Sequence, residues 1–234
     1  AMVDLAADPA NQVTLATTTT ALLEAHRAGQ RGAILGLQNA LLLGTEVSAV
    51  DHFFAAGVRV FALTHMGHNA FADSSRPLFN AALGTREATA EHGGLSDLGR
   101  GAIRRINALG GIVDISQLSK QAALQAMTVS TTPVIASHSN ARALTNVSRN
   151  LSDEELDAIA ATGGVVHIAP FAGYLFDSSD PKLDAAIRSV RRNAGIDEDY
   201  LYPFELYWEI KDVAIKTEFL TRDGSLCPRL DSAE

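Results

Sequence analysis

The chain has 234 residues, which is enough for one sizeable domain with a core of its own. Its net charge of −8 argues against nucleic acid or an anionic membrane surface as the main partner, and ordinary solubility is enough to explain it. Cys227 is the only cysteine, so no internal disulfide can form, and no apolar run approaches the ~20 residues of a membrane span. No signal peptide is visible, so we expect a soluble protein that is either cytoplasmic or exported with its leader removed.

The first predicted elements are a helix, a strand and a second helix. Residues 14–30 are predicted to be helical because a threonine run can cap them and apolar side chains follow at helical spacing. The apolar run 33–37 predicts a strand that ends at Gln38. Thr45 is predicted to cap the next helix, which has apolar residues on one face and ends at Gly57 in the left-handed conformation.

A second strand and a long loop come next. The strand is predicted over 58–64 and ends at His65. Residues 66–93 then form a loop rich in small and polar residues, and a loop of that length in a compact domain is usually functional or mobile. We expect His68, which lies within it, to be a solvated loop residue. Ser96 begins the helix that follows the loop.

Three further strands alternate with helices. They are predicted over 111–116, 133–137 and 164–168, and the first two end at Gln117 and His138. Between them Ser119 caps one helix and Ser152 begins another with a capping box. The chain thus contains five strand-then-helix units in about 150 residues, which predicts an α/β fold with parallel strands and right-handed crossovers.

The C-terminal part of the sequence has a different pattern. Residues 180–192 and 203–220 are predicted to be helical with no strand between them, and 222–234 to be a flexible tail. Five aromatic side chains there pack back onto the sheet or form an oligomer contact: Tyr200, Tyr202, Phe204, Tyr207 and Trp208. A full eight-unit barrel needs roughly 250 residues. We therefore expect residues 1–234 to form a single, incomplete TIM-barrel-like domain, with an open sheet as the alternative.

Polar side chains stand where four of the predicted strands end. In a parallel barrel these ends converge on one mouth, so we predict that Gln38, His65, Gln117 and His138 share a pocket. A neutral imidazole there binds a metal or moves a proton, and the alternative for each histidine is a hydrogen-bonded place inside a loop. A neutral amide is a poor zinc ligand but can hydrogen-bond a substrate or a water molecule.

Two further groups are candidates for the same pocket. Asp114 lies inside the third predicted strand, where it either orients a ligating side chain or is a buried, paired acid. The arginine of the Arg149-Asn150 pair is suited to bidentate capture of a carboxylate, and its alternative is a surface salt bridge.

Several segments, taken together, resemble the membrane dipeptidase family of zinc metallopeptidases. The similar stretch runs from Gly32 to about Leu175, and its matching pieces are 34–39, 63–65, Asn69, 72–73, 94–99, 113–117, 133–139 and 149–151. The resemblance implies a (β/α)8 barrel, a two-zinc site, homodimers and hydrolysis of dipeptides, including some with a D-residue on the C-terminal side.

The resemblance also implies a role for each pocket residue. His138 falls on a zinc ligand, His65 on a histidine that helps to stabilise the tetrahedral intermediate, and Arg149 on the arginine that holds the substrate carboxylate, with Asn150 beside it. Gln38 stands where the family has the glutamate that bridges both metals, and Gln117 where it has another zinc histidine. The family's N-terminal His-x-Asp pair and its late aspartate have no counterpart in this sequence.

These differences leave two functions open. Without the bridging carboxylate and with only His138 kept among the ligands, we predict that this chain does not hold a two-zinc cluster. The first possibility is a dipeptidase-like amidohydrolase of which this chain is a portion or a divergent copy. The second is an inactive homologue that binds a small carboxylate or serves as an assembly partner, and in both cases we expect a homo-oligomer. A third reading, an open-sheet module whose pocket residues are merely structural, agrees poorly with the resemblance.

Overall fold

The computed structural model describes residues 6, 8–80, 83, 85–171, 174, 175, 181, 185, 188, 189, 213, 214 and 217. The predicted C-terminal helices lie almost entirely outside these residues, and the tail 222–234 and the aromatic residues between 200 and 208 lie wholly outside them. No helix within the described residues has the length and apolar character needed to cross a membrane.

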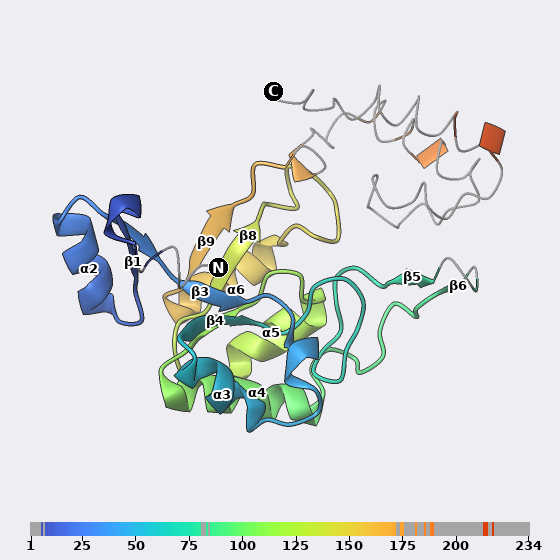
Figure 1. The fold of residues 1–234 in the computed structure, drawn as a ribbon. Coiled ribbons are helices and arrows are strands. Elements are labelled where there is room, and N and C mark those ends of the chain that lie inside the picture. The colour runs from blue at the N-terminus through green and yellow to red at the C-terminus, as the bar shows by residue number, and fades with distance from the viewer. Residues whose placement is uncertain are drawn as a thin grey trace.

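A five-stranded parallel sheet forms the centre of the fold (Figure 1). Its strands, in spatial order, are β3 (Leu35–Leu37), β4 (Val58–Ala62), β7 (Ile112–Asp114), β8 (Ile135–Ser139) and β9 (Val165–Ile168). Every neighbouring pair is parallel, as expected for strands joined by helical crossovers. The sequence prediction of an α/β fold with the topology of an incomplete parallel barrel is therefore confirmed.

Four helices connect the strands and cover one face of this sheet. They are α3 (Ala49–Ala55), α4 (Asp97–Leu109), α5 (Lys120–Val129) and α6 (Asp153–Thr162). The main core lies between them and the sheet, where Phe61 and Val113 pack with helix residues such as Ile103 and Ile159. Burial of this apolar surface supplies the main free energy that holds the layers together.

Serine caps predicted from the sequence begin α4, α5 and α6. Ser96 accepts a hydrogen bond from the Gly99 N–H at 3.1 Å, and Ser119 accepts one from the Ala122 N–H at 3.1 Å. The capping box at Ser152 is also present. These local signals were readable because each needs only neighbouring residues.

The N-terminal part differs from the predicted helix over 14–30. It contains the short 3-10 helix η1 (Pro9–Asn11), strand β1 (Val13–Leu15), helix α2 (Thr19–Arg27) and strand β2 (Arg31–Ala33). β1 pairs with β2 in a separate two-stranded parallel sheet, which Figure 1 shows to one side of the main sheet. The helix begins later than predicted because Thr18, rather than an earlier residue, caps it, and the predicted strand 33–37 is divided between β2 and β3.

Two other local predictions need correction. α3 begins after Ser48 and not at Thr45, and its first turn is tight, because the N–H groups of residues 49–51 each donate to the carbonyl three residues back. The long loop 66–93 contains a short antiparallel hairpin, β5 (Phe79–Asn80) and β6 (Thr85–Arg86), and the 3-10 helix η2 (Ala40–Leu43) follows β3.

The second face of the sheet positions the candidate site. Along each strand, side chains alternate between the helix-covered core and this other face. Phe61 and Val113 point into the core, whereas Val60 and Asp114 line a cavity on the other side, and Leu37 at the end of β3 belongs to both the core and the cavity wall. Within β4 and β7 the alternation therefore separates the residues that stabilise the fold from those that form the pocket.

Candidate functional site

A cavity of about 270 Å³ lies on the second face of the sheet. Residues from the strands and from the segments that follow them line it: Ile34, Gly36, Leu37, Gln38, Val60, Asp114, Ile135, Ser137 and His138. Of the four residues predicted to share a pocket, Gln38 and His138 therefore line one cavity, whereas His65 and Gln117 are not among its lining residues.

Gln117 joins this group through His138. Its Oε1 lies 3.2 Å from His138 Nε2, within hydrogen-bond distance. The Gln117 backbone has a φ of 69°, which is uncommon for a residue other than glycine. Such a conformation persists only where the surroundings hold it, and it is often found at functional sites.

The Gln117 carbonyl oxygen is the point at which this conformation is held. It accepts hydrogen bonds from Thr64 Oγ1 at 2.8 Å, Ser74 Oγ at 3.3 Å, Ser75 Oγ at 3.3 Å and the Ser75 N–H at 2.9 Å. Three hydroxyls and one amide thus converge on a single buried acceptor. They connect the end of β4 and the loop after it to the residue that faces His138.

Asp114 reaches the same imidazole from the other side. Its carboxylate is buried, and it accepts hydrogen bonds from the backbone N–H groups of Ser116 and Ser137 at 2.9 and 3.0 Å. The Ser137 hydroxyl donates to Asp114 and lies 2.7 Å from His138 Nδ1. Asp114 is therefore a buried acid that is linked to His138 through one hydroxyl. The sequence reasoning missed Ser137, although its place next to His138 was a usable signal.

Arg149 is almost completely buried beside these residues. It is 2% exposed, so the surface salt bridge considered from the sequence is wrong. Nη1 donates to Ser139 Oγ at 3.0 Å and Nη2 donates to the His138 carbonyl at 2.5 Å. The Tyr174 ring lies 5.5 Å from the guanidinium carbon.

Arg149 carries a positive charge in this buried position. Within the described part of the chain it has no carboxylate partner, and its buried Nε has no hydrogen-bond acceptor. Burial lowers the pKa of Arg149 to about 10, which still leaves the guanidinium charged at neutral pH. Asn150 next to it donates to the Thr145 and Tyr174 carbonyls at 2.9 and 3.0 Å.

Electrostatics favour neutral imidazoles in this site. Burial, followed by the charges of Arg76 and Arg149, lowers the pKa of His65. Burial and then Arg149 also lower the pKa of His138, while Asp114 acts in the opposite direction. Both rings are thus mainly uncharged at neutral pH, in a region where the arginines supply positive potential.

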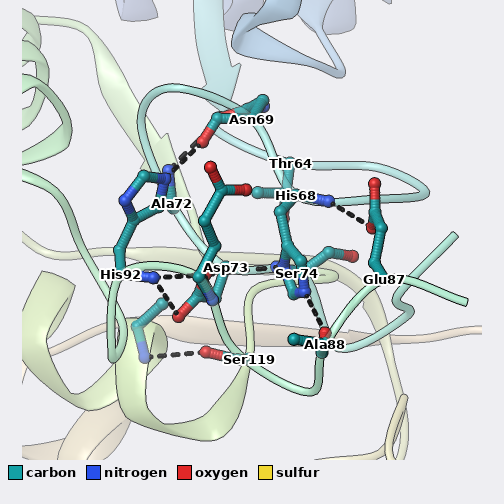
Figure 2. Close-up of polar contacts among 12 residues, drawn as sticks. Thr64, His68, Asn69, Ala72, Asp73, Ser74, Glu87, Ala88, His92 and Ser119 are labelled. Carbon is teal, nitrogen blue, oxygen red and sulfur yellow. Dashed lines mark hydrogen bonds and ion pairs between the residues drawn. The ribbon is translucent and has the colours of Figure 1, made fainter.

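The loop 66–93 is organised by a buried carboxylate that the sequence reasoning did not single out. Figure 2 shows Asp73 receiving the backbone N–H groups of residues on the far side of the loop. The bonds from Glu91, His92 and Gly94 are 2.8, 3.0 and 2.7 Å long, and the Asp73 carbonyl accepts from the Ser119 N–H at 2.8 Å. Asp73 therefore ties both arms of the loop to the start of α5.

His68 belongs to this network, so the prediction that it is solvated is wrong. Its side chain is 1% exposed, and its Nδ1 lies 3.5 Å from an Asp73 oxygen. Nδ1 accepts from the Ser74 N–H at 3.0 Å and Nε2 donates to the Ala88 carbonyl at 2.8 Å (Figure 2). Ala88 lies 20 residues from His68 in the sequence, which is why loop composition alone gave the wrong expectation.

Comparisons with known proteins were consistent with one family. Residues 1–198 match the family described as "Membrane dipeptidase (Peptidase family M19)". Dipeptidase tcpJ from Claviceps purpurea (strain 20.1) is 36% identical over 143 residues, which cover 61% of this chain and 31% of that protein. Dipeptidase verJ from Clonostachys rogersoniana is 31% identical over 170 residues, which cover 73% of this chain and 41% of that protein.

A solved structure supports the same relationship. The crystal structure of the probable dipeptidase PvdM from Pseudomonas aeruginosa is similar, with a TM-score of 0.76 and 32% sequence identity. The similarity covers 96% of this chain and 56% of that one. The chain thus spans less than half the length of the two curated relatives and somewhat more than half of this solved structure.

Proposed function

The chain belongs to the membrane dipeptidase family, and from this premise we propose that its strand-end site binds the carboxylate end of a dipeptide or of a similar small molecule. Arg149 is the observation that carries the proposal. A buried guanidinium with an unpaired Nε and no ion-pair partner in the described residues is costly unless an anion completes its hydrogen bonds. A planar carboxylate matches the guanidinium geometry.

The remaining pocket residues have roles that follow from their chemistry. His65 is proposed to contact the bound ligand near its peptide group, and Asn150 to hold the loop that presents Arg149. Gln38 and Gln117 offer amide donors and acceptors, which suit the polar groups of a peptide. His138, held by Ser137 and Gln117, is proposed to complete this polar wall.

We also propose that these residues do not hold the two-zinc cluster of the family. The donor set at the three matching positions is one imidazole and two neutral amides, and zinc favours imidazole, thiolate and carboxylate ligands. Asp114, the buried carboxylate nearest to them, is engaged with Ser116 and Ser137. Two zinc ions at close range need carboxylates to offset their repulsion. By the family resemblance, Gln38 stands at the position of the glutamate that bridges the two ions.

Hydrolysis of dipeptides is the second candidate function. The curated relatives are named dipeptidases. The resemblance noted in the sequence implies that His65, His138 and Arg149 stand at family positions. Hydrolysis through the family's metal chemistry would need ligands in addition to those of this chain. The family resemblance also predicts a homo-oligomer, which light scattering coupled to size-exclusion chromatography would test.

A pair of ligands that differ in one group tests carboxylate binding. We expect L-alanyl-L-alanine to bind about 10- to 100-fold more tightly than its C-terminal amide, because a hydrogen bond to a charged group contributes about 1.5–3 kcal/mol. Arg149→Gln should remove this preference, and isothermal titration calorimetry would measure all four affinities. Equal affinity of the wild-type chain for acid and amide would refute the proposal, and a thermal melt of the variant would verify its folding.

A further inference from the structure

Arg142 encloses the backbone that carries Arg149. Its Nε donates to the Val147 carbonyl at 3.2 Å and to the Asn150 carbonyl at 3.1 Å, and its Nη2 donates to the Ser148 carbonyl at 3.0 Å. These three carbonyls flank Arg149 on both sides in the sequence. One guanidinium thus fixes the positions of the peptide groups on either side of the proposed carboxylate ligand.

The same loop is closed by backbone hydrogen bonds at its base. The Arg142 N–H donates to the Leu151 carbonyl and the Leu151 N–H donates to the Asn140 carbonyl, both at 2.8 Å. Between these bonds, residues 143–150 leave both sheet and helix, and the chain turns back on itself. Inside this turn the Arg142 side chain replaces the hydrogen bonds that regular secondary structure would have supplied.

The charge of Arg142 is directed at backbone groups of the loop. The side chain is half-buried, and within the described ranges no carboxylate lies within 4.0 Å of it. Its charge is instead directed at carbonyl oxygens, which makes charge-assisted hydrogen bonds that are stronger than neutral ones. A lysine could not reproduce them, because an ammonium group lacks the planar fork that reaches several acceptors at fixed angles.

From this geometry we propose that Arg142 is a positioning residue that sets the orientation of Arg149 for carboxylate recognition, an inference that rests on the function proposed above. Arg142 acts through the loop backbone and not by touching the ligand. Loss of its fork lets the 147–150 backbone move, and displacement of the Arg149 guanidinium by a fraction of an ångström weakens the paired hydrogen bonds to a carboxylate.

The chain contains a matched control for this role. Arg59 also donates to three backbone carbonyls, with Nε bonding Thr17 and Nη1 bonding Phe54 and Val58, each at 2.8 Å. It lies near the N-terminal end of β4, whereas the cavity residues Gln38 and His138 lie toward the C-terminal strand ends. Arg59→Gln therefore removes the same kind of side-chain support at a site away from Arg149.

The test compares acid and amide ligands across variants. Isothermal titration calorimetry with L-alanyl-L-alanine and its C-terminal amide gives an acid-over-amide affinity ratio for the wild type, Arg142→Gln, Arg142→Lys and Arg59→Gln. We expect the ratio to fall about tenfold in Arg142→Gln, because displacement of Arg149 weakens its charged hydrogen bonds to the ligand. It should fall by a smaller factor in Arg142→Lys and stay within about twofold of the wild type in Arg59→Gln.

The outcomes separate this inference from the function on which it rests. A wild-type ratio near one refutes carboxylate binding itself, whatever the variants do. A high wild-type ratio that Arg142→Gln and Arg142→Lys both retain overturns the positioning role alone. If Arg142→Gln does not fold, the milder Arg142→Lys decides the question by the same ratio. An equal fall in Arg59→Gln also overturns the inference, because the effect would then reflect general loss of stability.

Discussion

The charge of the buried Arg149 side chain faces neutral acceptors. Two of its nitrogens bond a hydroxyl and a carbonyl, and the third lacks an acceptor in the described structure. A buried cation left in this state costs free energy, so an anionic ligand that completes its hydrogen bonds stabilises the folded chain by binding to it. The proposed function depends on this incompletely hydrogen-bonded guanidinium.

Asp73 shows the opposite arrangement, a buried anion whose hydrogen bonds are complete. Burial alone would raise the pKa of its carboxyl, but the N–H groups of Glu91, Gly94 and His92 and the nearby His68 bring that pKa below the ordinary value of 3.8. Because the folded-state pKa is lowered, the stabilisation is present above the unfolded-state pKa and is lost as the pH falls through the folded-state value.

Replacement of this carboxylate gives a pH-dependent prediction. Asp73→Asn should lower the free energy of unfolding by about 1–3 kcal/mol at pH 7, since an amide cannot accept all the N–H groups. The difference from the wild type should shrink as the pH falls below the ordinary carboxyl pKa of 3.8. Urea denaturation at several pH values measures it, with Asp157→Asn on the exposed face of α6 as the control. A cost that is independent of pH would contradict the assignment.

Two glycines of helix α4 show how closely this helix packs against the loop before it. Gly99 lies in its first turn against the backbone of the loop before it, and a Cβ there would overlap the Phe71 carbonyl oxygen. Gly101 lies in the same helix, but a Cβ there would meet only the Val47 side chain at 3.2 Å. The two glycines therefore differ in what surrounds them and not in their secondary structure.

We predict opposite effects for alanine at these positions. Gly101→Ala should change stability little or raise it by up to about 1 kcal/mol through helix propensity. Gly99→Ala should lower the free energy of unfolding by more than about 2 kcal/mol, because a backbone atom must move to admit the methyl group. Chemical denaturation of both variants measures the contrast, and equal stabilities would show that α4 does not pack closely against the loop.

Elements were predictable from the sequence where local chemistry decides them. Ser96, Ser119 and Ser152 begin helices as predicted, because a cap needs only its own first turn. The helix predicted over 14–30 failed because β1 forms by pairing with β2, which lies on the far side of α2 in the sequence. Threonine and valine there suit a strand, but only once its partner is known.

The candidate site was predictable from the sequence only where the position of a residue in its strand decides its place. The placement of Gln38 and His138 in one cavity follows from strand ends in a parallel sheet. The burial of His68 depends on contacts between distant segments, such as Asp73 with His92, and the role of Arg142 depends on the shape of a loop that lacks regular structure. Periodicity and spacing contain no information about such contacts.

At the scale of the whole molecule, the sheet has one covered face and one that forms the pocket. The helices bury the side chains of the first face, and the second face presents Gln38, Asp114, Ser137 and His138 around the cavity. The parallel topology brings these polar groups together, and we propose that Gln38 and Gln117 place amides where the family has metal-binding donors. The chain therefore has a dipeptidase-family fold and a pocket suited to hydrogen bonding.

Dipeptide binding to the metal-free chain tests whether the pocket recognises its ligand without zinc. Isothermal titration calorimetry would measure the affinity for L-alanyl-L-alanine after treatment with a chelator and again after addition of zinc, with bound zinc counted by mass spectrometry. The account predicts saturable binding of the same affinity in both conditions and no stoichiometric zinc. Binding that appears only when about two zinc ions are held per chain would contradict it.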